Sequence, residues 1–134
     1  MPLVIAKEIS DARTLCESAR LGGKRVAFVP TMGALHEGHL RLIDAARESG
    51  GFVAVSIFVN PIQFGPGEDF DRYPRDLDGD ASKLRARGVD LVFAPLASAM
   101  FPDEARTKVS VSEITQGLCG AFRKGHFDGV ATIV

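Results

Sequence analysis

The chain has 134 residues, of which 46% are apolar and 25% are charged, and its formal net charge at pH 7 is -1. This length suits a single globular unit with a substantial core. Sixteen Lys and Arg against seventeen Asp and Glu argue against a dedicated nucleic-acid-binding protein. The longest apolar run, FVAVSIFV, is too short to span a bilayer, and the N-terminus lacks a secretion signal. We therefore expect a cytoplasmic protein with neither nucleic acid nor membrane as a partner.

Short apolar runs alternate with segments of helical periodicity along the chain. In chain order they predict a strand at 3–6, a helix capped by Ser10 and stopped by Gly22-Gly23, a strand at 25–30, a helix from Glu37 to Gly50-Gly51, a strand at 52–59, a helix over 77–87 and a strand at 90–95. The second helix is expected to run through Leu40, Leu42, Ile43 and Ala46. The run at 52–59 is apolar on both faces apart from Ser56, which is typical of a central parallel strand.

Less regular segments fill the rest of the chain. Residues 60–76 predict a long loop, 96–105 a short helical turn and loop, 107–111 an exposed strand, and 112–118 a helix of one or two turns. The final segment, HFDGVATIV, ends on an apolar run without a stop signal, as if cut within an element. Strands separated by helices of this length predict an α/β fold, a doubly wound parallel sheet with helices on both faces, incomplete at its end.

Two cysteines, Cys16 and Cys119, stand alone among apolar neighbours. Neither belongs to a CxxC pair, and no histidine lies at ligand spacing. We expect both to be reduced core residues without a disulfide.

The unusual loops all follow predicted strands. They are PTMGALHEGH after 25–30, NPIQFGPGEDF after 52–59 and PLASAMFP after 90–95. Because ligands bind beyond the carboxyl ends of parallel strands, we expect these loops to converge on one site.

The first of these loops carries a histidine pair, His36 and His39. Their spacing of three differs from the HExxH zinc motif, and no third ligand is nearby, so a metal site is disfavoured. Gly33 and Gly38 would let backbone amides approach a ligand at a helix N-terminus, which suits a polyphosphate. Imidazole donors there would stabilise charge in phosphoryl chemistry. The alternative is that the histidines only cap or pack locally.

A second candidate site lies in IFVNPIQF, where Asn60 and Gln63 stand among Phe58, Ile62 and Phe64. Amides in an apolar cleft suit a small polar ligand with hydroxyl and carboxylate groups. The alternative for Asn60 is ordinary turn chemistry before Pro61.

Acidic residues cluster after this segment. They are Glu68, Asp69, Asp71, Asp76, Asp78 and Asp80. They could assist a magnesium-bound nucleotide, but acidic residues in loops and before helices usually cap helices or face solvent, so no metal ligand is assigned. A third candidate is the small cationic cluster of Arg123, Lys124 and His126, which could cover an anion or be a surface loop.

The chain closely resembles the pantothenate synthetase (pantoate-beta-alanine ligase) family. The resemblance lies in PTMGALHEGHLRLI, VSIFVNPIQFGPGEDFDRYPRDLDGD, LVFAP and GHFDGVATIV, which occur in order over essentially the whole chain. The HxGH element alone is common to nucleotidyltransferases and class I aminoacyl-tRNA synthetases, whereas NPxQF, YPR and GHFxGV are narrower.

The resemblance implies that residues 1–134 are an incomplete N-terminal Rossmann-like nucleotide-binding domain. It also implies ATP-dependent ligation of pantoate and beta-alanine through a pantoyl adenylate, with magnesium accompanying ATP. By the same resemblance we expect a homodimer. The ATP segment would be Met32, Gly33, Ala34, Leu35, His36, Glu37, Gly38 and His39, with His39 as proton donor and His36 sharing phosphate contacts. The pantoate and beta-alanine contacts would be Gln63, Asn60, Phe58, Ile133 and Val134.

The family is about twice as long as this chain, and its GEKD and SSRN segments and smaller second domain are absent here. We therefore expect these 134 residues alone to be weakly active or inactive. Two other functions stay open: another HxGH nucleotidyltransferase, or a non-catalytic nucleotide-binding or dimerisation module.

Overall fold

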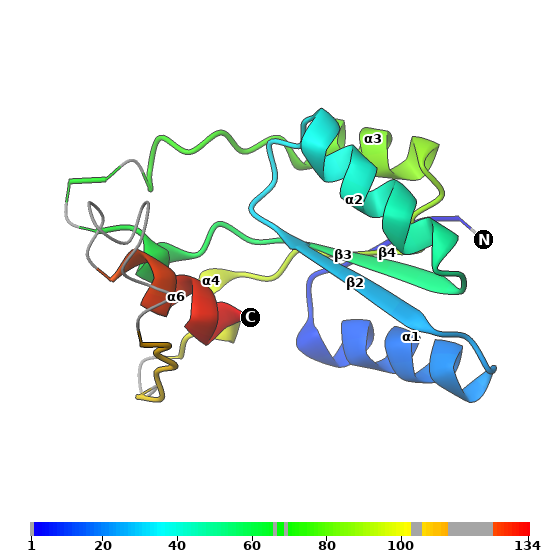
Figure 1. Cartoon of the computed structure of the whole chain (residues 1–134), viewed down its shortest axis with the longest axis horizontal. Helices are drawn as coiled ribbons and strands as arrows, with labels where there is room; N and C mark the ends of the chain where they lie inside the picture. Colours follow the sequence, from blue (N-terminus) through cyan, green and yellow to red (C-terminus); the bar gives the residue numbers. More distant parts are fainter. Residues whose placement is uncertain (1, 66, 69, 103–105, 113–124) are drawn as a thin grey trace. The chain divides into compact units, whose positions relative to one another are not determined.

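A computed structural model describes residues 2–65, 67–68, 70–102, 106–112 and 125–134 (Figure 1). The chain forms two compact units, one made of residues 1–58 and 74–100 and the other of residues 59–73 and 101–134. The β-sheet belongs to the first unit, and the described part of the second unit holds two short helical segments. None of the helices in the described ranges has the length and apolar character needed to cross a membrane.

The first unit is built on a parallel sheet with the strand order β1-β4-β3-β2. Its strands are β1 (Val4–Ala6), β2 (Val26–Thr31), β3 (Phe52–Ile57) and β4 (Leu91–Phe93). Its helices are α1 (Ile9–Leu21), α2 (Glu37–Glu48), α3 (Leu77–Ala86) and the short α4 (Ala97–Met100). The alternation of strands and helices read from the sequence is confirmed, with most ends shifted by one or two residues.

The order of the strands explains why helices cover both faces of the sheet. The chain crosses from β1 at one edge to β2 at the other, and then returns through β3 to β4, which pairs with β1. Right-handed crossovers that run in opposite directions place their helices on opposite faces. Figure 1 shows α1 on one face and α2 and α3 on the other. The predicted doubly wound α/β fold is therefore confirmed.

Strand β3 is buried on both faces, as its apolar sequence predicts. Val53 and Val55 pack with Ile43 of α2 and Leu84 of α3. The alternate residues of β3 pack in a second cluster, together with alanines of α1. Side chains alternate between the faces of a strand, so a central strand needs apolar residues at every position.

One detail of the predicted helices is wrong. Helix α1 begins at Ile9 and its N-cap is Glu8, because Glu8 has the extended backbone of a cap whereas Ser10 already lies in the first turn. Helix α2 runs through Leu42 as predicted, and the Leu42 side chain is 59% exposed. Leu40 and Ile43 are three residues apart and share a face, while Leu42 points to one side of it.

The described part of the second unit consists of the 3-10 turn η1 (Pro61–Gln63), which packs against α6 (His126–Ile133), and the irregular chain around them. The predicted loop at 60–76 thus contains a short ordered turn. The strand predicted at 107–111 is wrong, because this segment is irregular and its residues Val109 and Ser110 form hydrogen bonds with side chains of α6. The helix predicted at 112–118 lies, except for its first residue, outside the described residues.

Cys16 carries a free thiol and packs half-buried against the cluster beneath α1. Burial raises the pKa of this thiol, and the charge of Arg20 opposes that effect. Cys119 lies outside the described residues, so the expected absence of a disulfide stays a prediction.

Candidate functional site

The turn that joins β2 to α2 is attached to the sheet at Thr31, the last residue of β2. The hydroxyl of Thr31 donates a hydrogen bond to the backbone oxygen of Ser56 (2.8 Å) and accepts one from the Gly33 N–H (3.1 Å). Gly33 has a φ of 78°, and a Cβ there would lie 3.0 Å from Asp80 Oδ2 and 3.0 Å from a methyl carbon of Ile57. Both the backbone conformation and the available space therefore require glycine.

Two side chains of α3 hold the middle of this turn. Asp80 accepts the Ala34 N–H on Oδ2 and the Leu35 N–H on Oδ1, each at 2.9 Å. Lys83 Nζ donates to the backbone oxygen of Leu35 at 2.8 Å. Side chains of α3 therefore bind both the N–H and the C=O of Leu35.

The backbone of this turn has the form of an anion site. Gly33 and Ala34 both have positive φ values, 78° and 50°. Successive residues in turn conformations of this kind present neighbouring N–H groups to one side, and such concavities bind anions. Here the anion is the protein's own carboxylate, Asp80, which is only 3% exposed. A contact of Ala34 or Leu35 with ATP would have to use atoms other than their N–H groups.

Asp80 has a role that its sequence context did not predict, since acidic residues before and within helices were expected to cap helices or face solvent. That description is right for Asp76, the N-cap of α3, and for the exposed Asp78. It is wrong for Asp80, which the helix turns toward the β2–α2 turn. A signal was present, because the helical spacing from Leu77 to Leu84 places Asp80 between them on the buried face.

The two histidines cap the start of α2. His36 is the N-cap, and its Nδ1 accepts the Gly38 N–H at 3.0 Å. His39 Nδ1 accepts the His36 N–H at 3.3 Å, and the two ring centroids are 4.1 Å apart. A Cβ on Gly38 would lie 2.9 Å from the His36 ring, so glycine lets the ring fold over the turn. Both Nδ1 atoms therefore take part in local capping, and a contact of these histidines with phosphate stays a prediction.

Capping also determines where the ring protons lie. A ring nitrogen that accepts an N–H carries no proton, so the proton of each neutral imidazole is on Nε2. No hydrogen bond of either Nε2 is found within the part of the chain that the structure describes. His36 and His39 therefore both offer an Nε2–H donor to a ligand while Nδ1 holds the turn.

Burial lowers the pKa of His39, the neighbouring His36 lowers it further, and the negative charge of Asp80 raises it in opposition. The net effect favours the neutral ring at pH 7. This agrees with the hydrogen bond that Nδ1 accepts.

The amide pair predicted to contact substrate lies in the second unit and is buried, with Asn60 1% and Gln63 7% exposed. Asn60 Nδ2 donates to Gln63 Oε1 and to the backbone oxygen of Gly129, both at 3.0 Å, and Oδ1 accepts the Ile62 N–H at 3.3 Å. The turn-forming role of Asn60 is confirmed. Both of its amide protons are used internally, and among the described residues Gln63 Nε2 has no partner. The donors that this pair offers a ligand are those of Gln63.

Helix α6 contacts the backbone of Gln63 at two of its residues, His126 and Gly129. His126 Nδ1 lies 3.0 Å from the Gln63 backbone oxygen, so this nitrogen carries the proton. At Gly129 an added Cβ would lie 2.5 Å from Gln63 Cα, which shows how closely the helix approaches the turn. Arg123 and Lys124, the other members of the predicted cationic cluster, lie outside the described residues.

The predicted apolar walls are divided between the units. Phe58, whose N–H donates to the Thr31 backbone oxygen at 3.0 Å, belongs to the first unit. Ile133 and Val134 belong to the second, where Val134 is 80% exposed. Convergence of the loops on one site therefore stays a prediction.

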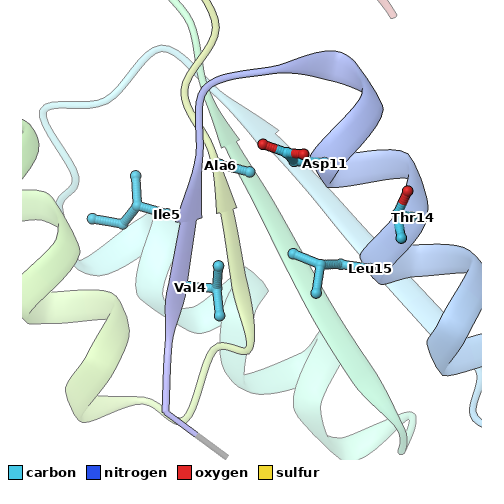
Figure 2. A pocket seen from close by; sticks show the side chains of 6 residues that line it. All are labelled: Val4, Ile5, Ala6, Asp11, Thr14 and Leu15. Carbon is cyan, nitrogen blue, oxygen red and sulfur yellow. The ribbon is translucent and has the colours of Figure 1, made fainter.

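No group of three or more His, Cys, Asp or Glu side chains suited to a metal ion is found in the described ranges. Glu68 accepts the Gly65 N–H and Asp71 is exposed, while Asp69 lies outside the described residues. A separate groove runs between β1 and α1 (Figure 2). Its lining residues are Val4, Ile5, Ala6, Asp11, Thr14 and Leu15. It contains none of the predicted site residues, and we assign it no function.

Comparison with known proteins places these features in a family. The family model for pantoate-beta-alanine ligase matches residues 4–134. The chain is 57% identical to the pantothenate synthetase of Thermoanaerobacter sp. (strain X514), over 98% of this chain and 47% of the relative. It is 56% identical to that of Aquifex aeolicus (strain VF5), over 100% of this chain and 47% of the relative.

Solved structures that are similar to this chain belong to the same family. The pantoate-beta-alanine ligase of Francisella tularensis, complexed with beta-gamma ATP and beta-alanine, is similar with a TM-score of 0.89 and 38% identity, covering 98% of this chain and 50% of that one. The pantothenate synthetase of Thermus thermophilus is similar with a TM-score of 0.85 and 47% identity, covering 96% of this chain and 45% of that one. The chain thus spans about half the length of the relatives it matches.

Proposed function

The chain belongs to the pantoate-beta-alanine ligase family, and from this we propose that it carries the nucleotide half of an ATP-dependent ligase that joins pantoate to beta-alanine. A carboxylate oxygen of pantoate attacks the α-phosphorus of ATP, the bond to pyrophosphate breaks, and pantoyl adenylate forms. The amine of beta-alanine then attacks the acyl carbon, and AMP and a proton leave. The Francisella tularensis relative, which binds an ATP compound and beta-alanine, supports this choice of substrates.

The observation that carries the proposal is the pair of Nε2–H donors on His36 and His39, for which no partner is found among the described residues. Negative charge grows on the phosphate oxygens as the α-phosphorus is attacked, and fixed donors stabilise that charge. His39 is the proton donor in this proposal, and His36 shares the phosphate contacts. Removing one fixed donor of this kind typically lowers kcat by about 10²–10³-fold.

The remaining assignments follow from the same family. Gln63 would contact pantoate and beta-alanine through Nε2, and Asn60 would hold the Gln63 side chain in place. Magnesium would arrive with ATP, and no residue of this chain is assigned to it. The cytoplasmic location and the homodimer expected from the family stay predictions.

The test measures MgATP binding and AMP release by the 134 residues with pantoate and beta-alanine. Because the chain spans about half of its relatives, we expect ATP binding with weak or no turnover. His39→Gln keeps a cap acceptor in its amide oxygen, replaces the imidazole Nε2–H by an amide donor in a different position, and should weaken ATP binding. Arg41→Gln, on the exposed side of α2, should not.

Failure to bind ATP would contradict the nucleotide site, and full turnover would contradict the expectation of weak activity. AMP release that did not depend on pantoate would instead favour another HxGH nucleotidyltransferase. In a full-length protein with measurable turnover, AMP release unchanged by His39→Gln would favour a non-catalytic nucleotide-binding module, whereas lost AMP release with retained ATP affinity would support the catalytic role of His39.

A further inference from the structure

We propose that Asp80 is a positioning residue of the nucleotide site, an internal carboxylate that fills the anion-binding turn after β2 and thereby sets the direction of His36 and His39. The identity of the ligand rests on the proposed function, whereas the positioning itself does not. The sequence analysis assigned no role of this kind to Asp80.

The burial of Asp80 requires an explanation. An ionised carboxylate is costly to remove from water unless its oxygens accept hydrogen bonds. Asp80 is 3% exposed, and in the described residues no Lys or Arg forms an ion pair with it. Its compensation comes from the Ala34 and Leu35 N–H groups, one to each oxygen. Hydrogen bonds to a charged acceptor are stronger than neutral ones, so this carboxylate is suited to hold a backbone in an unusual conformation.

The conformation it holds is one that most residues avoid. Ala34 has a φ of 50°, the only positive φ of a non-glycine residue in the described chain. Such a backbone persists only where surrounding contacts impose it. The contacts here are the two hydrogen bonds of Asp80 and the bond from Lys83 to the Leu35 oxygen.

A continuous series of contacts leads from Asp80 to the histidines. Leu35, held at both its N–H and its C=O, directly precedes His36. The His36 N–H donates to His39 Nδ1, and the His36 ring accepts from Gly38. The position of the Leu35 peptide therefore determines where both Nε2–H groups point. Asp80 acts on the ligand through these groups and need not touch it.

Asp80→Asn tests this proposal, with Asp78→Asn as the matched control on the exposed side of the same helix. An asparagine keeps one acceptor oxygen and turns an NH2 group toward a backbone donor, so one N–H of the turn loses its partner. We expect faster hydrogen exchange at Ala34 and Leu35, at least tenfold weaker MgATP binding, and a His39 pKa, measured by NMR titration, that rises toward its ordinary value. Asp78→Asn should change none of these.

The direction of the His39 pKa separates positioning from a simple effect of charge. Removing the negative charge of Asp80 from an intact turn would lower the pKa of His39, because that charge raises it. Releasing the turn would expose the ring to water and raise the pKa. A lowered pKa with unchanged exchange at Ala34 and Leu35 would overturn the proposal, as would unchanged ATP affinity after the turn is released.

A second pair of variants covers the case in which Asp80→Asn does not fold. Lys83→Gln frees the Leu35 oxygen without disturbing a buried residue, and Arg85→Gln is its exposed control. We expect roughly threefold weaker MgATP binding for Lys83→Gln alone. No difference between these variants would contradict the proposal. If the unsubstituted chain did not bind MgATP, the proposed nucleotide site would fail, while exchange and the His39 pKa would still test the positioning.

Discussion

The two groups of candidate site residues are held in place by different means. The β2–α2 turn is bound to the sheet through Thr31 and to α3 through Asp80, so its donors depend on the packed core. The amide pair of the second unit is held by neutral hydrogen bonds and by the close approach of α6 at Gly129. A cavity made in the core should therefore disturb the β2–α2 turn. A methyl group added at Gly129 should disturb the amide pair of the second unit.

Leu84→Ala is expected to have the largest effect and to act on the first group. Leu84 is fully buried between α3 and the sheet, one helical turn after Asp80. Truncating a buried leucine costs about 2–5 kcal/mol and would loosen the helix that holds the turn. Denaturant unfolding should show the lost stability, and hydrogen exchange should become faster at Ala34 and Leu35.

The control for that variant is Leu96→Ala, because Leu96 is 69% exposed. Its free energy of unfolding should change by no more than about 0.5 kcal/mol. Equal losses in the two variants, or an equal rise in exchange at Gln63 and at Leu35 after Leu84→Ala, would contradict the separation of the two groups.

Gly129→Ala should act on the second group. The added Cβ would lie 2.5 Å from Gln63 Cα and 2.6 Å from the Gln63 nitrogen, and these backbone atoms have little freedom to move. Overpacking of this kind costs about 1–3 kcal/mol and would separate Asn60 from the Gly129 oxygen. Amide exchange in α6 and η1 should become faster, while exchange at Leu35 stays the same.

A glycine without a close neighbour provides the comparison for Gly129→Ala. Gly22 has a φ of -78°, and a Cβ there would lie 3.5 Å from the nearest atoms, which is ordinary contact. Gly22→Ala should therefore leave stability within about 0.5 kcal/mol. Unchanged α6 exchange in Gly129→Ala would show that the helix does not hold the amide pair.

The smallest expected effect is a loss of order in the β2–α2 turn as pH falls. Because the pKa of His39 is lower in the folded chain than in the unfolded chain, the unfolded chain binds its proton first. The contribution of His39 to stability is complete above its unfolded pKa of about 6.5, and is lost as pH falls from there through the lower folded pKa. Exchange at the His36 amide, compared at pH 7.5 and at lower pH, measures this change.

His39→Gln sharpens that measurement. Glutamine at the third helical position can accept the N-cap N–H and does not titrate. Most of the pH dependence at the His36 amide should disappear in this variant. A pH dependence equal to that of the original chain would show that His39 is not its source.

Local sequence patterns predicted much of the fold. A run that is apolar apart from Ser56 predicted the central position of β3 in the sheet, and glycine pairs ended the first two helices close to where the structure ends them. The patterns failed where the environment of a residue decides the outcome. Residues 107–111 alternate like a strand, yet Val109 and Ser110 bind side chains of α6. Alternation describes a half-buried segment and does not specify its partner.

The sequence by itself determined which chemical groups are available: two histidines at a strand-to-helix turn, and two amides after the next strand. The tertiary structure alone decided how those groups are used. Asp80 binds Leu35 from 45 positions away, and Gly129 binds Asn60 from 69 positions away. These contacts depend on how α3 packs on the turn and α6 on η1. Helical periodicity can place Asp80 on the buried face of α3, but it does not specify which segment that face meets. As a result, a carboxylate that sequence reasoning left at the surface became the internal anion of the turn.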